Sequence, residues 1–322
     1  MNPLVSIIIP TFNRAALIES TLNSILKQRY AYWECIVVDD GSTDSTVQIL
    51  QAYCSKDARF KFYKRPKNRP KGANACRNYG LLKAKGTYVN WFDSDDLMLP
   101  LKLQIQVALL ENSSFNYAIC QTERFDSTLN KSFGLRSIEI TSSDVLNDYI
   151  TFKIFWTTGA PLWCKDFLIS NKFTFDESLQ QSQDYNYHIN ILAKDASYAI
   201  ANVPLMKLVR HTSNMSNDLY SHPSKIYSNI KARCMALKLH FELLNDSTRV
   251  FLFKKSVEFL EYGIEVLNWK YTTKSIYQLI SAYYVFKPPV NVFIRYSLKW
   301  LLGGFGYRVF RIGKRFFKLP PI

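Results

Sequence analysis

The sequence VSIIIPTFN at residues 5–13 opens the pattern that decides the fold. Val5 to Ile9 form a continuous apolar run rich in β-branched residues, which is typical of a buried parallel strand, and Pro10 is expected to end it. Residues 15–27 then carry apolar side chains at helical spacing, and the run CIVV at 35–38 predicts a second buried strand. The chain thus begins with a strand, a helix and a second strand.

This alternation continues to about residue 95. Further helices are predicted at 42–53 and 73–84, and further strands at 60–63 and 88–92. Four alternations of this kind argue for an α/β fold with an open, mostly parallel sheet flanked by helices. In such sheets ligands bind beyond the carboxyl ends of the strands, so the residues that follow each strand are the candidates for function.

The last third of the chain has a different character. Gly and Pro become scarce after Ser224. Helices are predicted over 224–243, 248–268 and 272–285. We therefore expect an α/β domain at residues 1–222 and a helical C-terminal extension at 223–322. The N-terminal apolar run is too short for a signal peptide, and no run of about 18 apolar residues predicts a membrane-spanning helix.

Composition and charge narrow the class of protein. Of 322 residues, 48% are hydrophobic and 21% are charged, which excludes a wholly disordered chain. Lys and Arg number 41 against 26 Asp and Glu, so the net charge is +15 and an anionic partner is expected. No acidic residue follows Glu265, while ten cations do. The excess charge is therefore concentrated at the C-terminal end.

Six cysteines are spread along the chain, and no two lie closer than 19 residues. This spacing contains no CxxC pair and no zinc-ligand pattern. It predicts buried or free thiols in a reducing compartment, so a cytoplasmic or peripheral protein is expected.

The stretch VVDDGSTDST at 37–46 carries the first candidate site. Asp39 and Asp40 follow a predicted strand directly, and two like charges brought together there repel each other. A turn in the core does not need such a pair, whereas a carboxylate at this edge can accept hydrogen bonds from a base or a ribose. The alternative is a turn that caps the next helix, which is the simplest interpretation of Asp44.

The stretch WFDSDDLMLP at 91–100 carries the second candidate site. Asp93, Asp95 and Asp96 follow a fully apolar strand, and their mutual repulsion in a partly dry cleft is costly. A divalent cation that bridges them to a diphosphate removes this cost, and oxygen ligands suit Mg²⁺ or Mn²⁺. The alternative is a solvated acidic turn.

Two further polar residues are ambiguous when each is taken alone. Asp184 precedes a helical stretch, so it would ordinarily be assigned as a helix N-cap. His211, in VRHTSNMS at 209–216, would more often be structural than a ligand.

Taken in order, these motifs carry a resemblance to a known family. The stretches are SIIIPTFNR at 6–14, VVDDGSTD at 37–44, ACRNYGLLKAKGTYVNWFDSDD at 75–96, FDE to QD at 175–184, and RHTSNMS at 210–216. Their spacing resembles that of family 2 inverting glycosyltransferases with the GT-A fold, a Rossmann-like sheet flanked by helices. The resemblance covers about residues 1–220.

The resemblance implies a role for each matching residue. It implies that Asp40 contacts the base of a nucleotide-sugar donor, usually a UDP-sugar, and that Pro10 lines the pocket for that base. Arg77 matches an arginine near the nucleotide. Asp93 and Asp95 match the D-x-D pair, with Asp95 the direct ligand of Mn²⁺ or Mg²⁺, and His211 matches a residue that closes over the diphosphate and binds the metal.

The resemblance also implies that Asp184 is the catalytic base. The family usually has Glu-Asp at this point, whereas this chain has Gln183 before Asp184, so the neighbour of the base is neutral. The implied reaction is a single displacement that inverts the anomeric centre, with a glycan or lipid-linked acceptor, in bacterial cell-surface polysaccharide synthesis. Two other functions remain open: another metal-dependent transferase or nuclease that binds nucleotides, and a basic nucleic-acid-binding protein. The first three motifs in this order favour the glycosyltransferase, so no nucleic-acid partner is expected.

The C-terminal cations are interleaved with aromatic and aliphatic residues over 291–318. Bulky aromatics together with Lys and Arg suit the headgroup boundary of an anionic membrane. Gly303, Gly304 and Gly306 predict that the segment is broken into two short helices. A peripheral position at the inner face of the plasma membrane is therefore expected. The alternative is that the aromatics pack on the catalytic domain or form a dimer seam; the sequence does not fix the oligomeric state.

Overall fold

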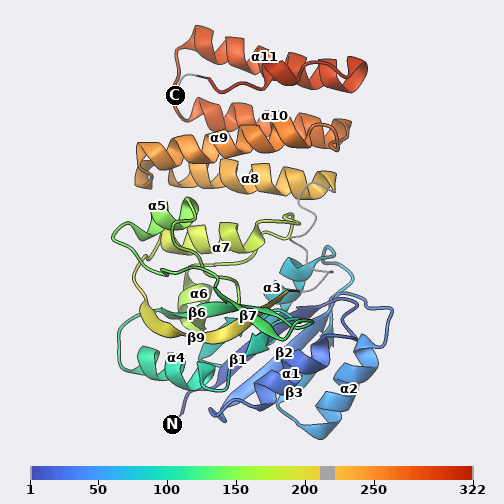
Figure 1. Cartoon of the computed structure of the whole chain (residues 1–322), viewed down its shortest axis with the longest axis vertical. Helices are drawn as coiled ribbons and strands as arrows, with labels where there is room; N and C mark the ends of the chain where they lie inside the picture. Colours follow the sequence, from blue (N-terminus) through green and yellow to red (C-terminus); the bar gives the residue numbers. More distant parts are fainter. Residues whose placement is uncertain (1, 211–221, 321–322) are drawn as a thin grey trace. The chain divides into compact units, whose positions relative to one another are not determined.

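A computed structural model of the chain describes residues 2–210 and 222–320 (Figure 1). By its internal contacts the chain forms two compact units, and each is described separately. Of the described residues, unit 1 contains 2–143, 153–177 and 195–210. Unit 2 contains 144–152, 178–194 and 222–320, so it takes two segments from within the first two thirds of the chain.

Unit 1 is built on a nine-stranded sheet with the order β3-β2-β1-β4-β8-β6-β9-β5, and β7 pairs with β6. The strands are β1 (Val5–Thr11), β2 (Trp33–Asp39), β3 (Phe60–Lys64), β4 (Tyr88–Trp91), β5 (Leu97–Met98), β6 (Tyr117–Asp126), β7 (Lys131–Leu135), β8 (Leu162–Cys164) and β9 (Ala199–Arg210). Strands β1 to β4 are mutually parallel, as predicted from their apolar runs. Strand β8 is antiparallel to both of its neighbours, β4 and β6, and β6 is parallel to β9.

Pro10 lies inside β1 instead of ending it, which corrects the expectation from sequence. Strand β1 continues to Thr11, and Pro10 is in register with Val38 of β2. On the opposite side the pairing of β1 with β4 ends at Ile8. A proline lacks the amide N–H, so it is tolerated where the strand has a neighbour on one side only.

The described part of unit 1 contains five helices: α1 (Ile18–Leu26), α2 (Thr46–Lys56), α3 (Ala73–Lys83), α4 (Lys102–Glu111) and α6 (Lys165–Ser170). The core includes the fully buried strand residues Ile7, Ile8, Ile36 and Val38, and helix residues such as Ile25 and Leu103. Helix α3 approaches β1 closely at Gly80, where an added Cβ would lie 2.3 Å from Ile8 Cγ2. A larger residue at position 80 would therefore push α3 away from the sheet whose edge carries the candidate site.

Unit 2 is helical, and Figure 1 shows α8 to α11 stacked on one another. Its elements are α5 (Val145–Ile150), α7 (Gln183–Leu192), α8 (Pro223–His240), η2 (Phe241–Leu243), α9 (Asp246–Gly263), α10 (Trp269–Tyr284), α11 (Val290–Phe310) and η3 (Lys314–Phe316). Helix α8 packs on α7, α9 and α10, and α11 packs on α10. The core contains Ile226, Leu237, Phe253, Tyr283 and Trp300.

Helix α11 is continuous through its glycines, which corrects the expectation of two short helices. An added Cβ at Gly304 would lie 2.4 Å from Ile276 Cδ1 of α10. An added Cβ at Gly303 would lie 3.0 Å from the Cβ of Phe316. The glycines therefore serve close packing and not a break, because the absent side chains leave room for the neighbouring elements. None of the helices within 2–210 and 222–320 is long and apolar enough to cross a membrane.

Candidate active site

The carboxyl ends of β2 and β4 flank that of β1, so the two acidic motifs of unit 1 lie at one edge of the sheet. Asp39 is 1% exposed and accepts hydrogen bonds from the backbone N–H of Gly41 at 3.0 Å and of Ser42 at 3.0 Å, and from the Ser42 hydroxyl. Asp39 therefore shapes the turn after β2. This leaves Asp40 as the member of the pair whose side chain is turned to other elements.

Asp40 organises the loop at residues 65–72 that connects β3 and α3. Its carboxylate forms an ion pair with Arg65 and accepts a hydrogen bond from the Gly72 N–H at 2.9 Å. Its own N–H donates to the carbonyl of Thr11 at 2.9 Å, which ties it to the end of β1 next to Pro10. Asp40 and Pro10, predicted to serve the donor base, therefore lie at adjoining strand ends, and Arg65 is the cation next to Asp40.

The three carboxylates after β4 divide into two partly exposed groups and one buried group. The Asp93 side chain is 34% exposed and pairs with Arg77 Nη2 at 2.7 Å. The Asp95 side chain is 15% exposed and lies 3.9 Å from Arg14 Nε. Asp96 is 2% exposed and accepts a hydrogen bond from the Val209 N–H at 3.0 Å. Burial, with the charges of Asp95 and Asp93, raises the pKa of the Asp96 carboxyl well above its usual range.

Arg77 is held from several sides. It is 3% exposed, it donates to Asn74 Oδ1 at 3.3 Å, and its guanidinium lies 5.1 Å from the centre of the Phe175 ring. Asn78, one turn after Asn74, donates to the carbonyl of Phe175 at 2.9 Å and accepts from its N–H at 2.9 Å. The FDE stretch at 175–177 thus fixes the face of α3 that presents Arg77 to Asp93. The only sign of this role in the sequence is the spacing of the polar residues in NACRN at 74–78.

The residues of this edge fit a divalent ion that shares its ligands with a bound diphosphate. Among residues 2–210 and 222–320, no three His, Cys, Asp or Glu side chains are grouped to hold a metal ion by themselves. Asp93 and Asp95 offer carboxylate oxygens, and Mg²⁺ sites commonly use one or two carboxylates together with substrate phosphates. The neighbouring guanidinium groups of Arg77 and Arg14 also suit phosphate oxygens. His211, the other predicted ligand, lies outside the described residues.

Asp184 belongs to unit 2 and lies in the first turn of α7. The N-cap of this helix is Ser182, so the helix-capping alternative for Asp184 does not hold. Its Oδ1 accepts a hydrogen bond from the Tyr185 N–H at 2.7 Å, and a negative charge in the first turn is favoured by the helix dipole. The carboxylate thus lies at the N-terminal end of α7 with one oxygen bound to the backbone of its own first turn.

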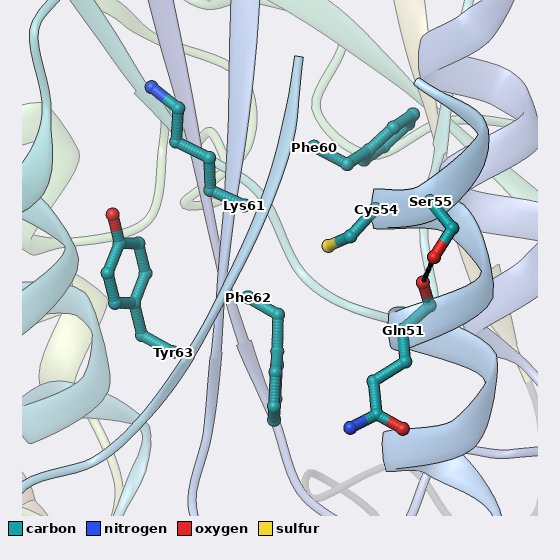
Figure 2. A pocket seen from close by; sticks show the side chains of 7 residues that line it. All are labelled: Gln51, Cys54, Ser55, Phe60, Lys61, Phe62 and Tyr63. Atoms are coloured by element: carbon teal, nitrogen blue, oxygen red, sulfur yellow. Dashed lines mark hydrogen bonds between the residues drawn. The ribbon is translucent and has the colours of Figure 1, made fainter. Parts of the chain in front are cut away.

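A surface groove lies on unit 1 between α2 and the edge strand β3, as Figure 2 shows. It is lined by Gln51, Cys54, Ser55, Phe60, Lys61, Phe62 and Tyr63. None of the predicted site residues lines it. The groove is therefore distinct from the acidic edge of the sheet.

Comparison with known proteins identifies the family. A family model described as "Glycosyl transferase family 2" matches residues 6–167, which contain both acidic motifs of unit 1. The chain belongs to glycosyl transferase family 2. Among relatives, an uncharacterized glycosyltransferase of Rickettsia typhi, RT0329, is 29% identical over 81% of this chain and 81% of its own length.

Other similarities are more restricted in extent. A glucosyltransferase of Escherichia coli, WfgD, is 38% identical over 35% of this chain and 44% of its own length. A glycosyltransferase of Haemophilus influenzae is 40% identical over 38% of this chain, and that match spans 50% of the relative. Among solved structures, S. aureus TarS in complex with UDP-GlcNAc has a TM-score of 0.65 at 18% identity, covering 87% of this chain and 81% of that one. This family 2 chain thus has the predicted GT-A fold with a helical C-terminal region.

Proposed function

We propose that this family 2 chain transfers a sugar from a nucleotide-sugar donor, a UDP-sugar, to a hydroxyl group of a lipid-linked glycan, with inversion at the anomeric carbon. The observation that carries this proposal is the pair of partly exposed carboxylates, Asp93 and Asp95, at the sheet edge that also carries Asp40. Arginines accompany each of them, so the edge combines groups for a metal ion with groups for a diphosphate.

The names of relatives and structural neighbours support the classes of donor and acceptor. TarS was solved with UDP and with UDP-GlcNAc, and a mannosyltransferase of Pyrobaculum calidifontis with GDP-Man and Mn²⁺. WfgD is named as a transferase from UDP-Glc to a diphosphoundecaprenol-linked GlcNAc. A Campylobacter jejuni relative, 33% identical over 47% of this chain, is named as acting on a glycan linked to undecaprenol diphosphate. A role in bacterial cell-surface polysaccharide synthesis, at the cytoplasmic face of the membrane, follows for this chain as part of the proposal.

Each candidate residue has a separate role in the proposed reaction. Asp40, beside Pro10, accepts hydrogen bonds from the donor base. Asp95 would be the direct ligand of the metal ion, with His211 as a further ligand, while Asp93 and its partner Arg77 would serve the nucleotide-sugar near the diphosphate. When bound, a Mn²⁺ or Mg²⁺ ion supplies Lewis-acid stabilisation of the leaving diphosphate.

Asp184 is the general base of the proposed reaction. It removes the proton from the acceptor hydroxyl while that oxygen forms a bond to the anomeric carbon and the bond to the nucleoside diphosphate breaks. Because Gln183 is neutral, it adds no negative charge beside Asp184. Asp184 therefore works without the acidic neighbour that most of the family has.

A donor screen tests this function. We expect the purified chain with Mn²⁺ to hydrolyse UDP-sugars faster than GDP- or dTDP-sugars, and to transfer the sugar to an undecaprenyl-diphosphate-linked acceptor. An α-linked donor should give a β-linked product, which the anomeric proton coupling in NMR reports directly. If no nucleotide-sugar is turned over while labelled oligonucleotides bind with a steep salt dependence, the nucleic-acid alternative replaces this proposal.

A further inference from the structure

Helix α11 has two apolar faces, and no element among the described residues of unit 2 covers one of them. The first face, which includes Trp300, Gly303, Gly304 and Tyr307, is buried in contact with α10 and η3. The second consists of seven residues that are between 46% and 73% exposed: Val290, Ile294, Leu298, Leu301, Leu302, Phe305 and Val309. Apart from the adjacent pair Leu301 and Leu302, these recur every three or four positions, so they lie along one side of the helix. We call them the outer face of α11.

The surroundings of the outer face are aromatic and cationic. The ring of Trp269, which is 49% exposed, lies 6.0 Å from that of Phe305. Two cations lie on α11 itself, Arg295 and Lys299. Three more come after the end of the helix: Arg311, Arg315 and Lys318. Two other cations are engaged internally, because Arg308 donates to the carbonyls of Leu267 and Ile264, and Lys314 pairs with Glu265.

The exposed apolar face and the nearby cations together favour one class of partner. An apolar stripe of this length is larger than the scattered apolar residues of an ordinary surface, so a partner is expected to cover it. A second copy of this chain that docked through the same face would bring its own cations against these, since no acidic residue follows Glu265. An anionic bilayer matches both the apolar stripe and the charge.

We propose that the outer face of α11 is a docking surface for an anionic phospholipid membrane. The helix lies parallel to the surface, with one face on α10 and the other in the boundary between headgroups and acyl chains. This deepens the part of the proposed function that places the chain at a membrane, but it does not depend on the donor or on the catalytic base. Since Trp300 and Tyr307 are core residues of unit 2, substitutions on the outer face are a cleaner test than truncation.

Vesicle sedimentation of the full chain tests the surface. The test variant is Ile294→Gln/Leu298→Gln/Phe305→Gln, and the control is Leu82→Gln/Leu129→Gln/Ile138→Gln, which removes three apolar residues of unit 1 that are even more exposed. We expect the wild type to bind phosphatidylglycerol vesicles more tightly than phosphatidylcholine vesicles, and the test variant to bind roughly tenfold or more weakly, since membrane binding scales with buried apolar area. The control should bind as the wild type does.

Charge substitutions separate the two contributions. Arg295→Gln/Lys299→Gln should weaken binding roughly tenfold at low salt, since each surface cation attracts an anionic leaflet. Lys27→Gln/Lys56→Gln removes two exposed cations from unit 1 and should have no effect. Unchanged melting temperatures show that the variants are folded. Equal vesicle binding by the wild type and the apolar variant, or a dimer in sedimentation velocity that this variant converts to a monomer, would overturn the proposal.

A separate observation concerns how the segment that leads to Asp184 is held in place. The segment before α7 is bound to α8 at three alternate residues: Ser178 accepts from Lys231, the Gln180 N–H donates to Ser228 Oγ at 2.9 Å, and Ser182 Oγ donates to Asn229 Oδ1 at 2.7 Å. Ser228 and Asn229 are 1% and 2% exposed. Ser182 has a φ of +57°, a left-handed conformation that disfavours residues with a Cβ.

Helix α8 also holds Tyr185, the residue that follows Asp184. Arg233 donates to both the carbonyl and Oδ1 of Asn229 at 3.1 Å, and its guanidinium lies 5.1 Å from the centre of the Tyr185 ring. The hydroxyl of Tyr185 in turn donates to the Ile150 carbonyl at 2.9 Å. We infer that Ser182 and Asn229 are positioning residues. The hydrogen bond between their side chains keeps the backbone of Ser182 left-handed and so fixes the first turn of α7. This rests on the proposed role of Asp184 as the base.

Two substitutions at one position test the inference. Ser182→Ala removes the hydrogen bond and keeps the Cβ, so kcat should fall roughly 10- to 100-fold, as expected for a misplaced group, with the KM for the donor unchanged. Ser182→Gly also removes the hydrogen bond but adopts a positive φ without strain, so kcat should largely recover. If both variants keep full kcat, or both lose it equally, Ser182 does not act through its backbone conformation. Full activity of Asp184→Asn would overturn the proposed base and this inference together, whereas an inactive Asp184→Asn with a fully active Ser182→Ala overturns this inference alone.

Discussion

Asp184→Asn should lower kcat by about 10²–10⁴-fold, the usual cost of losing a general base. The amide has nearly the shape of the carboxylate and can still accept a hydrogen bond from the Tyr185 N–H, but it cannot take the proton of the acceptor hydroxyl. The KM for the donor should change little, because the substitution leaves the strand ends of unit 1 intact. Steady-state transfer to a saturating acceptor measures both constants.

Asp246→Asn is a matched control for this substitution. Asp246 also lies in the first turn of a unit 2 helix, α9, where its side chain is 94% exposed and pairs with Arg249 at 2.8 Å. Its replacement removes a first-turn charge without touching α7, so kcat should stay as in the wild type. Equal kcat values for Asp184→Asn and the wild type would contradict the proposed base and leave Asp184 with a structural role in the first turn of α7.

Asp95→Ala should remove nearly all transfer activity and weaken Mn²⁺ binding in the presence of UDP. Lewis-acid stabilisation by a metal is worth several kcal/mol, and each 1.36 kcal/mol corresponds to a factor of ten, so a loss of roughly 10³-fold is expected. The fold should persist, because Asp95 is partly exposed and the buried acceptor for the Val209 N–H is Asp96. Isothermal titration with Mn²⁺ and UDP measures binding independently of turnover.

Asp126→Ala provides the comparison at another strand end of unit 1. Asp126 ends β6 and accepts hydrogen bonds from the N–H groups of Thr128 at 2.9 Å and Leu129 at 3.0 Å, so its removal tests the general effect of losing a strand-end carboxylate. It should retain metal binding and activity. Full wild-type activity in excess EDTA would contradict the metal requirement, whatever the behaviour of Asp95→Ala.

The sheet edge could be predicted from sequence because its signals are local. The β-branched runs of β1 and β2 and the acidic residues that follow β2 and β4 lie within short stretches, and the parallel order of these strands is confirmed. The different environments of the three carboxylates after β4 could not be predicted from sequence, because the burial of Asp96 depends on Val209, a residue more than one hundred positions away. The extension of β1 past Pro10 was likewise hidden, because it depends on where β4 stops.

The residues around Asp184 show the same limit more strongly. Its own motif is a few residues long, but Ser182 and Tyr185 on either side of it are held by Asn229 and Arg233 of α8. No periodicity in the sequence links residues 182 and 229. The packing of Gly304 on Ile276 was missed for a related reason, because a glycine that serves close contact and one that breaks a helix look alike in the sequence.

The discontinuous course of the chain through unit 2 bears on protein synthesis. Helix α7 is translated well before α8, to which the segment leading into it is hydrogen-bonded, and the chain from Lys194 to His240 must be added before α8 is complete. At roughly 5–20 residues per second this interval lasts about 2–9 s. The last strand of unit 1, β9, is made early in this interval, so for the rest of it a nascent chain would hold every strand of unit 1 with α7 still lacking its partner. Termination after β9 and before α8 would therefore give a protein with a complete sheet, in which the segment that leads to Asp184 lacks its hydrogen-bond partners on α8.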